Sequence, residues 1–135
     1  MRIFLATHGK MASGIKNTLD ILLGDSSKLV VFDAYLDESS VDEVVQEFLL
    51  TVDESETVLL LSDIFGGSVN QVLLQNSVRA NTYLVAGVNL PFILDMMLKD
   101  TVDAEIIDNS IEESRNALQR VEVAKLEVVE DEEFF

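Results

Sequence analysis

The chain has 135 residues, the size of one ordinary domain, and 48% of them are hydrophobic, which is enough for a sizeable core. It carries 9 Lys and Arg residues against 25 Asp and Glu residues, so its formal net charge is −16. That charge argues against binding to nucleic acid or to an anionic membrane, because both need clustered cations. It favours solubility and a basic protein partner. The absence of cysteine excludes disulfides, thiolate catalysis and zinc–thiolate sites.

No segment of the sequence is typical of export or of membrane insertion. The apolar stretch within residues 1–10 is too short for a signal peptide. No apolar run approaches the roughly 20 residues of a membrane span. We therefore expect a cytoplasmic protein with a single domain over residues 1–129 and an acidic tail over residues 130–135.

Short apolar runs alternate with helical patterns along the chain. The first run, residues 2–6, is typical of a strand that is buried on both faces. From Met11 the apolar residues adopt the helical period, and Gly24 follows where a C-cap glycine belongs. The expected strands are 2–6, 29–34, 57–63 and 82–87. The segments with a helical pattern are 11–23, 38–52, 69–77 and 88–100.

This alternation predicts the class of fold. Ser40 with Glu43 fits the S-x-x-E capping box, and Pro91 suits the first turn of a helix. Strands that alternate with helices form a parallel sheet with right-handed crossovers and helices on both faces. We therefore expect an α/β three-layer sandwich whose sheet is mainly parallel, has four strands and is flanked by helices.

The last third of the chain is less regular. Residues 104–108 form an ambiguous apolar run that we leave without an assignment. Ser110 with Glu113 fits a second capping box and predicts a helix that ends near Arg120. Residues 121–129 are rich in β-branched residues and alternate in polarity, so we expect an additional edge strand there.

Polar or glycine-containing segments follow each expected strand. In an open parallel sheet, ligands bind beyond the carboxyl ends of the strands. Four places meet that condition, namely 7–9, Asp33, 63–68 and 87–89. The first of them contains His8, the only histidine of the chain.

His8 can be a nucleophile, a general base, a metal ligand or a core residue. A structural role is the commonest one for an isolated histidine. Here the residue lies at a strand end, between Thr7 and Gly9, and not on an apolar face, which favours a functional role. A metal site is disfavoured because the chain has no second histidine, no cysteine and no carboxylate cluster with ligand spacing. We expect neither a metal nor a cofactor.

Asp63 ends the third expected strand. If that strand lies next to the first, its carboxylate can accept the His8 Nδ1–H, which fixes the tautomer and leaves the Nε2 lone pair free. Without His8, an ordinary polar cap would be the better interpretation of Asp63. Gly66, Gly67 and Ser68 then open a helix whose free N–H groups suit a phosphoryl group. The alternative is a tight turn with Ser68 as the N-cap.

Four motifs together resemble the IIA domain of the mannose family of the sugar phosphotransferase system (PTS). They are "THG" at 7–9, "MASGI" at 11–15, "DIFGGS" at 63–68 and "AGVNLP" at 86–91. The resemblance covers about residues 1–125. It implies a parallel sheet flanked by helices and a homodimer that exchanges a C-terminal edge strand, for which residues 121–129 are the candidate.

The resemblance also implies a mechanism. Phospho-HPr would donate its phosphoryl group to Nε2 of His8, and His8 would pass it to a histidine of a separate IIB protein. IIB phosphorylates the sugar during uptake through the membrane subunits IIC and IID. Asp63 would orient and stabilise His8. From their places near the strand ends, Phe65 and the residues 90–92 are candidate apolar contacts for partners; the alternative is a place in the core, which we expect for Phe92. The residues implied to line the pocket are Thr7, Gly9, Gly67, Ser68 and Asn89.

Two other interpretations stay open at this point. One is the phosphotransfer subunit of dihydroxyacetone kinase, which would pass the phosphoryl group to ADP on a kinase subunit. The other is a non-catalytic regulatory or small-ligand-binding domain in which His8 is structural. Its specific version, an aspartate-phosphorylated receiver, needs an acidic cluster after the first strand, where this chain has "THG".

Overall fold

The computed structural model describes residues 1–123, and residues 124–135 lie outside the described part. Strands and helices alternate through most of it, as expected. The strands are β1 (Arg2–His8), β2 (Leu29–Ala34), β3 (Val58–Ser62) and β4 (Thr82–Ala86). The helices are α1 (Met11–Leu23), α2 (Val41–Leu50), α3 (Ser68–Gln75), α4 (Leu90–Met97) and α5 (Ala104–Asn116).

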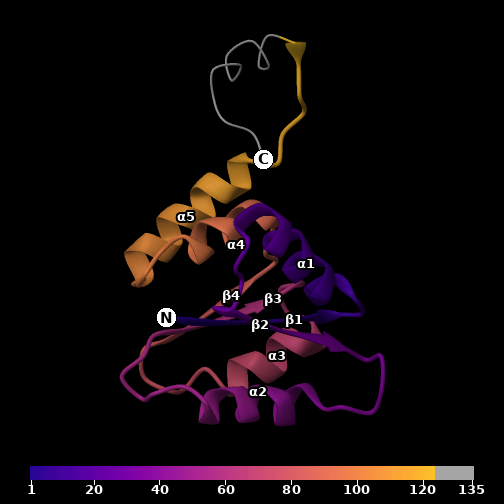
Figure 1. Cartoon of the computed structure of the whole chain (residues 1–135), viewed down its shortest axis with the longest axis vertical. Coiled ribbons are helices and arrows are strands. Elements are labelled where there is room, and N and C mark those ends of the chain that lie inside the picture. The colour runs from indigo at the N-terminus through magenta and orange to yellow at the C-terminus, as the bar shows by residue number, and fades with distance from the viewer. Residues whose placement is uncertain (124–135) are drawn as a thin grey trace.

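The four strands form one sheet in the order β2-β1-β3-β4, and every neighbouring pair is parallel. Helices α1, α4 and α5 cover one face of the sheet, and α2 and α3 cover the other (Figure 1). The predicted α/β sandwich with a parallel four-stranded sheet is therefore confirmed.

The position of strand β1 between two layers of helices explains its continuous apolar sequence. Ile3 and Leu5 pack into the core beneath α1 and α4, while Phe4 and Ala6 pack into the core on the α2 and α3 side. All four side chains are fully buried. A strand covered on both faces has no solvent side, so its residues do not alternate between apolar and polar.

Helix α2 begins as its sequence predicts. Ser40 is the N-cap, and its side chain accepts a hydrogen bond of 3.3 Å from the N–H of Glu43. This bond satisfies one of the N–H groups that a helix start leaves without a partner.

Helix α5 corrects the prediction of a helix start at Ser110. The helix begins at Ala104, because Asp103 is the N-cap and accepts a hydrogen bond of 2.9 Å from the N–H of Ile106. Ser110 is buried within the helix and donates a 2.6 Å hydrogen bond to Asp95 of α4. The Ser110 hydroxyl therefore joins two helices instead of capping one, and the unassigned residues 104–108 are the first turns of α5.

The expected edge strand at 121–129 falls mostly outside the described residues. Residues 121–123 are exposed and belong to none of the four strands. Within residues 1–123, every helix is too short or too polar to cross a membrane.

Candidate functional site

The candidate site lies where the chain leaves β1 and β3 in opposite directions. The two strands are neighbours in the sheet, with Ala6 paired to Ser62. The chain continues from β1 into α1 on one face, and from β3 into α3 on the other face (Figure 1). Such a divergence opens a crevice at the carboxyl ends of the strands. His8 ends β1 and Asp63 directly follows β3, so both lie at this crevice.

His8 and Asp63 are in direct contact although 55 residues separate them. Asp63 Oδ2 lies 2.9 Å from His8 Nδ1. The same oxygen accepts a hydrogen bond of 2.9 Å from the backbone N–H of His8. Because one carboxylate oxygen binds both the backbone and the ring of His8, the imidazole is held in a defined orientation.

The two side chains differ in their access to solvent. The His8 side chain is 41% exposed, whereas that of Asp63 is only 8% exposed. A carboxylate next to Nδ1 favours the tautomer in which Nδ1 carries the proton. The lone pair of Nε2 is then available at the surface of the crevice, on the part of the ring that a reaction partner can reach.

Two opposing effects act on the pKa of Asp63. Burial raises this pKa, but the hydrogen bonds from the backbone N–H and the ring of His8 outweigh it and hold the pKa below its usual value of 3.8. The other oxygen, Oδ1, is buried and has no hydrogen-bond partner within residues 1–123. Asp63 is therefore ionised at neutral pH and can stabilise positive charge on the His8 ring.

The lowered pKa predicts how stability depends on pH. A carboxyl group with a lower pKa in the folded state stabilises the fold above its unfolded pKa, and this contribution is lost as the pH falls through the folded pKa. We expect Asp63→Asn to be less stable than wild type at pH 7, with a difference that shrinks below about pH 4. Urea unfolding of both proteins from pH 7 to pH 3 measures this difference. A difference that stays constant over the range contradicts the prediction.

Helix α3 presents an open N-terminus beside His8. Its N-cap is Gly67, and no side chain caps the helix start, whereas Ser40, Asn89 and Asp103 cap α2, α4 and α5. A Cβ at Gly67 would lie 3.7 Å from His8 Cε1 and 3.4 Å from a backbone oxygen. The start of α3 therefore lies close to the imidazole, where the free N–H groups of the helix can bind an anion.

Ser68 is the first residue of α3 and not its N-cap, contrary to the simple-turn alternative. Its Oγ lies 3.4 Å from His8 Nε2, the nitrogen that faces away from Asp63. A hydroxyl and the N-terminal end of a helix thus lie beside Nε2 of His8. This arrangement suits an incoming group that carries negative oxygen atoms.

Thr7 and Gly9 shape the loop around His8 through their own contacts. Thr7 is fully buried, and its hydroxyl accepts a 2.8 Å hydrogen bond from the N–H of Ala12 at the start of α1. Gly9 has a φ of 60°, a conformation that suits glycine, and its N–H donates to the carbonyl oxygen of Ala34 at 2.9 Å. Both residues position the turn that carries His8, and the Thr7 hydroxyl is already engaged within the fold.

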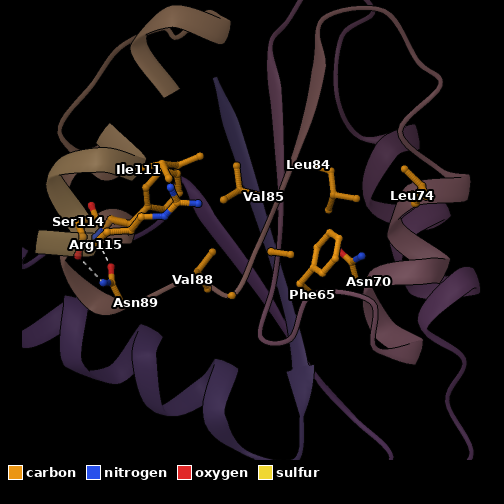
Figure 2. A pocket seen from close by; sticks show the side chains of 13 residues that line it. Phe65, Asn70, Leu74, Leu84, Val85, Val88, Asn89, Ile111, Ser114 and Arg115 are labelled. Atoms are coloured by element: carbon orange, nitrogen blue, oxygen red, sulfur yellow. Dashed lines mark hydrogen bonds between the residues drawn. The ribbon is translucent and has the colours of Figure 1, made fainter. Parts of the chain in front are cut away.

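Asn89 is used elsewhere. It is the N-cap of α4, where its side chain accepts a 3.0 Å hydrogen bond from the N–H of Phe92 and donates one of 2.8 Å to the carbonyl oxygen of Ser114. It lines a cavity of about 450 Å³ along β4, between the Phe65 loop and α5 (Figure 2). Neither His8 nor Asp63 lines that cavity.

Two aromatic residues named from the sequence have clear positions. Phe92 is 3% exposed and belongs to the core beneath α1 and α4, as expected. Phe65 is 85% exposed and lies in the loop between β3 and α3.

Sequence reasoning missed Tyr35, which directly follows β2. Its hydroxyl lies 2.6 Å from Ser68 Oγ, and its ring centroid is 5.2 Å from that of His8. Its position one residue beyond a strand end, close to Asp33 among the predicted ligand-binding places, could have identified it. Asp33 itself accepts a 2.9 Å hydrogen bond from the N–H of Ser13 and supports the start of α1.

Within residues 1–123, no three His, Cys, Asp or Glu side chains are grouped so that they could share a metal ion. The site brings together one imidazole, one buried carboxylate, one serine hydroxyl and one open helix start. This set can form a covalent bond from Nε2 to an electrophilic centre that carries negative oxygens, with the carboxylate stabilising the charged ring.

Comparison with known proteins agrees with this chemistry. The family model described as PTS system fructose IIA component (EIIA-man) matches residues 2–125. The chain belongs to this family of PTS IIA components. It is thus a IIA component of a sugar phosphotransferase system, and the family supports a role in phosphotransfer.

Individual relatives of the IIA component are distant in sequence but similar over most of their length. The PTS system fructose-specific EIIA component of Bacillus subtilis (strain 168) is 25% identical, over 96% of this chain and 97% of that protein. A putative phosphoenolpyruvate-dependent sugar PTS permease from Klebsiella pneumoniae has the same fold, with a TM-score of 0.80, 24% identity and coverage of 88% and 89% of the two chains. The PTS IIA protein associated with the fucose utilization operon from Streptococcus pneumoniae has a TM-score of 0.72 at 23% identity, with coverage of 94% and 95%.

Proposed function

We propose that this IIA component accepts a phosphoryl group from phospho-HPr on Nε2 of His8 and passes it to a separate IIB protein. The observation that carries the proposal is the 2.9 Å contact between His8 Nδ1 and the buried carboxylate of Asp63, with Nε2 open beside the start of α3. Asp63 is the orienting carboxylate, and Gly67 and Ser68 provide the phosphoryl-binding end of the site.

The transfer proceeds by displacement at phosphorus. The lone pair of Nε2 attacks, the bond from phosphorus to the donor histidine breaks, and its electron pair returns to the donor nitrogen. His8 now carries phosphorus on Nε2 and the proton on Nδ1, so the ring is positively charged. The adjacent Asp63 carboxylate stabilises this charge. A second displacement delivers the group to IIB: the lone pair of an IIB histidine attacks phosphorus, the bond from phosphorus to Nε2 of His8 breaks, and its electron pair returns to Nε2.

The start of α3 lowers the cost of placing phosphoryl oxygens at this position. The first turn of α3 contains no acidic residue and its N-cap Gly67 has no side chain to occupy the free N–H groups. Those N–H groups and the positive end of the helix dipole favour an anion within the first turn. Ser68 adds a hydroxyl donor at 3.4 Å from Nε2, which is close enough to reach an oxygen of a bound phosphoryl group.

Exposed apolar side chains gather in the loops at this end of the sheet. Five large ones belong to the start of α1 and to the segments that follow β2 and β3, and they are Met11, Tyr35, Leu36, Ile64 and Phe65. Such residues, next to a nucleophile that must meet two partners in turn, support a docking surface for HPr and IIB. A relay needs short-lived complexes, which a small apolar surface with a polar surround provides.

Labelling tests the proposal. The wild-type protein is incubated with enzyme I, HPr and phosphoenolpyruvate that carries a labelled phosphoryl group. We expect label on the protein that is lost in acid and kept in base, as a phosphohistidine requires, and that moves to IIB when IIB is added. Label that survives acid, or none at all with active enzyme I and HPr, contradicts the proposal.

We also propose that the protein is a homodimer in which residues 121–129 of one copy pair with a sheet edge of the other. The proposal is supported by the position of β4, which is an edge strand of the sheet among residues 1–123. Beside it lies the cavity of about 450 Å³, lined by apolar side chains such as Leu84, Ile111 and Leu74 (Figure 2). An uncovered strand edge next to apolar surface is a place where another chain can pair.

Deletion of residues 121–135 tests the homodimer. We expect the full-length protein to have the mass of a dimer in light scattering and the truncated protein to shift toward the monomer, because the exchanged segment is gone. Circular dichroism should show that the truncated protein still folds. A monomeric full-length protein, or a truncated protein that dimerises as strongly as the full-length one, contradicts this prediction.

A further inference from the structure

Tyr35 has an unusual backbone conformation. Its φ is 68°, in the left-handed region that residues other than Gly, Asn and Asp rarely adopt. The other non-glycine residue with a positive φ within residues 1–123 is Asn81, a residue type that tolerates this region. Strained residues of this kind persist where the surroundings hold them, and they concentrate at functional sites.

The burial of Tyr35 does not explain its position. The residue is 57% exposed and belongs to neither core. Both of its specific side-chain contacts are with the site. Its hydroxyl lies 2.6 Å from Ser68 Oγ, and its ring lies against that of His8 with centroids 5.2 Å apart at an angle of 42°.

The direction of the hydrogen bonds follows from the state of His8. With the proton on Nδ1 beside Asp63, Nε2 has only a lone pair and acts as an acceptor. The Ser68 hydroxyl is therefore the donor toward Nε2, and its own lone pair accepts the Tyr35 O–H. A chain of two hydrogen bonds runs from the Tyr35 hydroxyl through Ser68 Oγ to His8 Nε2. The bond from Ser68 to Nε2 is 3.4 Å long and therefore breaks easily.

We propose that Tyr35 is a positioning residue of the His8 site, which acts through Ser68. By donating to Ser68 Oγ, Tyr35 keeps the Ser68 hydrogen directed at the space over Nε2, where a phosphoryl oxygen replaces the nitrogen as acceptor. The contact between the tyrosine ring and the imidazole holds the hydroxyl in place. This inference rests on the proposed function, because it assigns to Tyr35 a part in phosphoryl transfer at His8.

The decisive variant is Tyr35→Phe, which removes the hydroxyl and keeps the ring against His8. We expect the rate of phosphoryl transfer from phospho-HPr to fall about fivefold, the effect of losing one hydrogen bond of ordinary strength. Tyr83→Phe is the matched control. It removes the hydroxyl of the other tyrosine of the chain, which lies on β4 and makes no hydrogen bond within residues 1–123, and its rate should equal that of wild type.

A double-mutant cycle tests whether Tyr35 acts through Ser68. If it does, the rate of the double variant with Tyr35→Phe and Ser68→Ala equals that of Ser68→Ala alone. Effects that multiply overturn the proposal, and so does a Ser68→Ala protein that transfers as fast as wild type. A Tyr35→Phe rate within twofold of wild type also overturns it.

A spectroscopic measurement separates positioning from a merely structural role. Because His8 is the only histidine, the imidazole ¹⁵N signals of the protein come from one residue. We expect Tyr35→Phe to shift the Nε2 signal, since the bond from Ser68 changes, and Tyr83→Phe to leave it in place. An unchanged Nε2 signal in Tyr35→Phe overturns the proposal. If wild type acquires no acid-labile label, the proposed function itself has failed, whereas a labelled wild type with an equally fast Tyr35→Phe refutes only the role of Tyr35.

Discussion

His8→Gln should carry no phosphoryl label above background in the assay with enzyme I, HPr and labelled phosphoenolpyruvate. Glutamine is close to histidine in length and polarity, but its amide nitrogen has no lone pair free for attack on phosphorus. The His8 side chain is 41% exposed, so the substitution changes no core packing. We therefore expect the variant to fold like wild type and to lose its activity completely.

Lys10→Gln provides the control for His8→Gln. Lys10 is an exposed residue of the same turn, and its side chain forms no hydrogen bond or ion pair with His8 in the described part of the chain. This protein should reach the same final level of label as wild type. If His8→Gln takes up acid-labile label at the rate of Lys10→Gln, another residue carries the phosphoryl group and the mechanism proposed for His8 is wrong.

Asp63→Asn should still accept a phosphoryl group, but more slowly by about 10²-fold or more. The neutral amide no longer stabilises the positive ring that forms when phosphorus binds to Nε2. It can also turn its NH₂ group toward Nδ1, which would move the imidazole proton to Nε2 and block the lone pair. Rapid-quench measurement of label on the protein, with saturating phospho-HPr, gives the rate.

Asp33→Asn is a matched control at the neighbouring strand. Asp33 lies in β2, and its carboxylate accepts hydrogen bonds from Ser13 at the start of α1 but none from His8. An asparagine oxygen can keep the hydrogen bond from the Ser13 N–H, so the transfer rate should stay within about threefold of wild type. Equal rates for Asp63→Asn and wild type would remove Asp63 from the mechanism. An equal loss in both variants would indicate a general effect of removing acidic charge.

Most of the fold was predictable because its signals are local. Helix α1 occupies the predicted residues 11–23, and β2 occupies the predicted residues 29–34. The misplaced start of α5 shows the limit of such signals. Ser110 and Glu113 have the spacing of a capping box, but the cap is Asp103, and the Ser110 hydroxyl is committed to Asp95. A motif of two residues cannot distinguish a helix start from a contact between helices that tertiary packing creates.

The candidate site, like the fold, could be predicted only in part. The pairing of His8 with Asp63 could be anticipated, since both residues lie at the carboxyl ends of strands, but it depended on β3 lying next to β1. The place of Gly67 and Ser68 at the site could be predicted from the glycine-containing motif at the start of α3. Asn89 also lies in a motif that follows a strand. Its side chain, however, caps α4 and binds Ser114, and the local sequence did not reveal these partners.

The sequence by itself determined the alternation of strands and helices, the burial of the central strands and the position of its one histidine at a strand end. These follow from residue type and spacing, which act over a few positions along the chain. Only the tertiary structure decided which side chains meet around the His8 ring. The contact of Tyr35 with Ser68 spans 33 residues and that of His8 with Asp63 spans 55, and hydrogen bonds over such separations depend on strand order and loop geometry to within a fraction of an ångström.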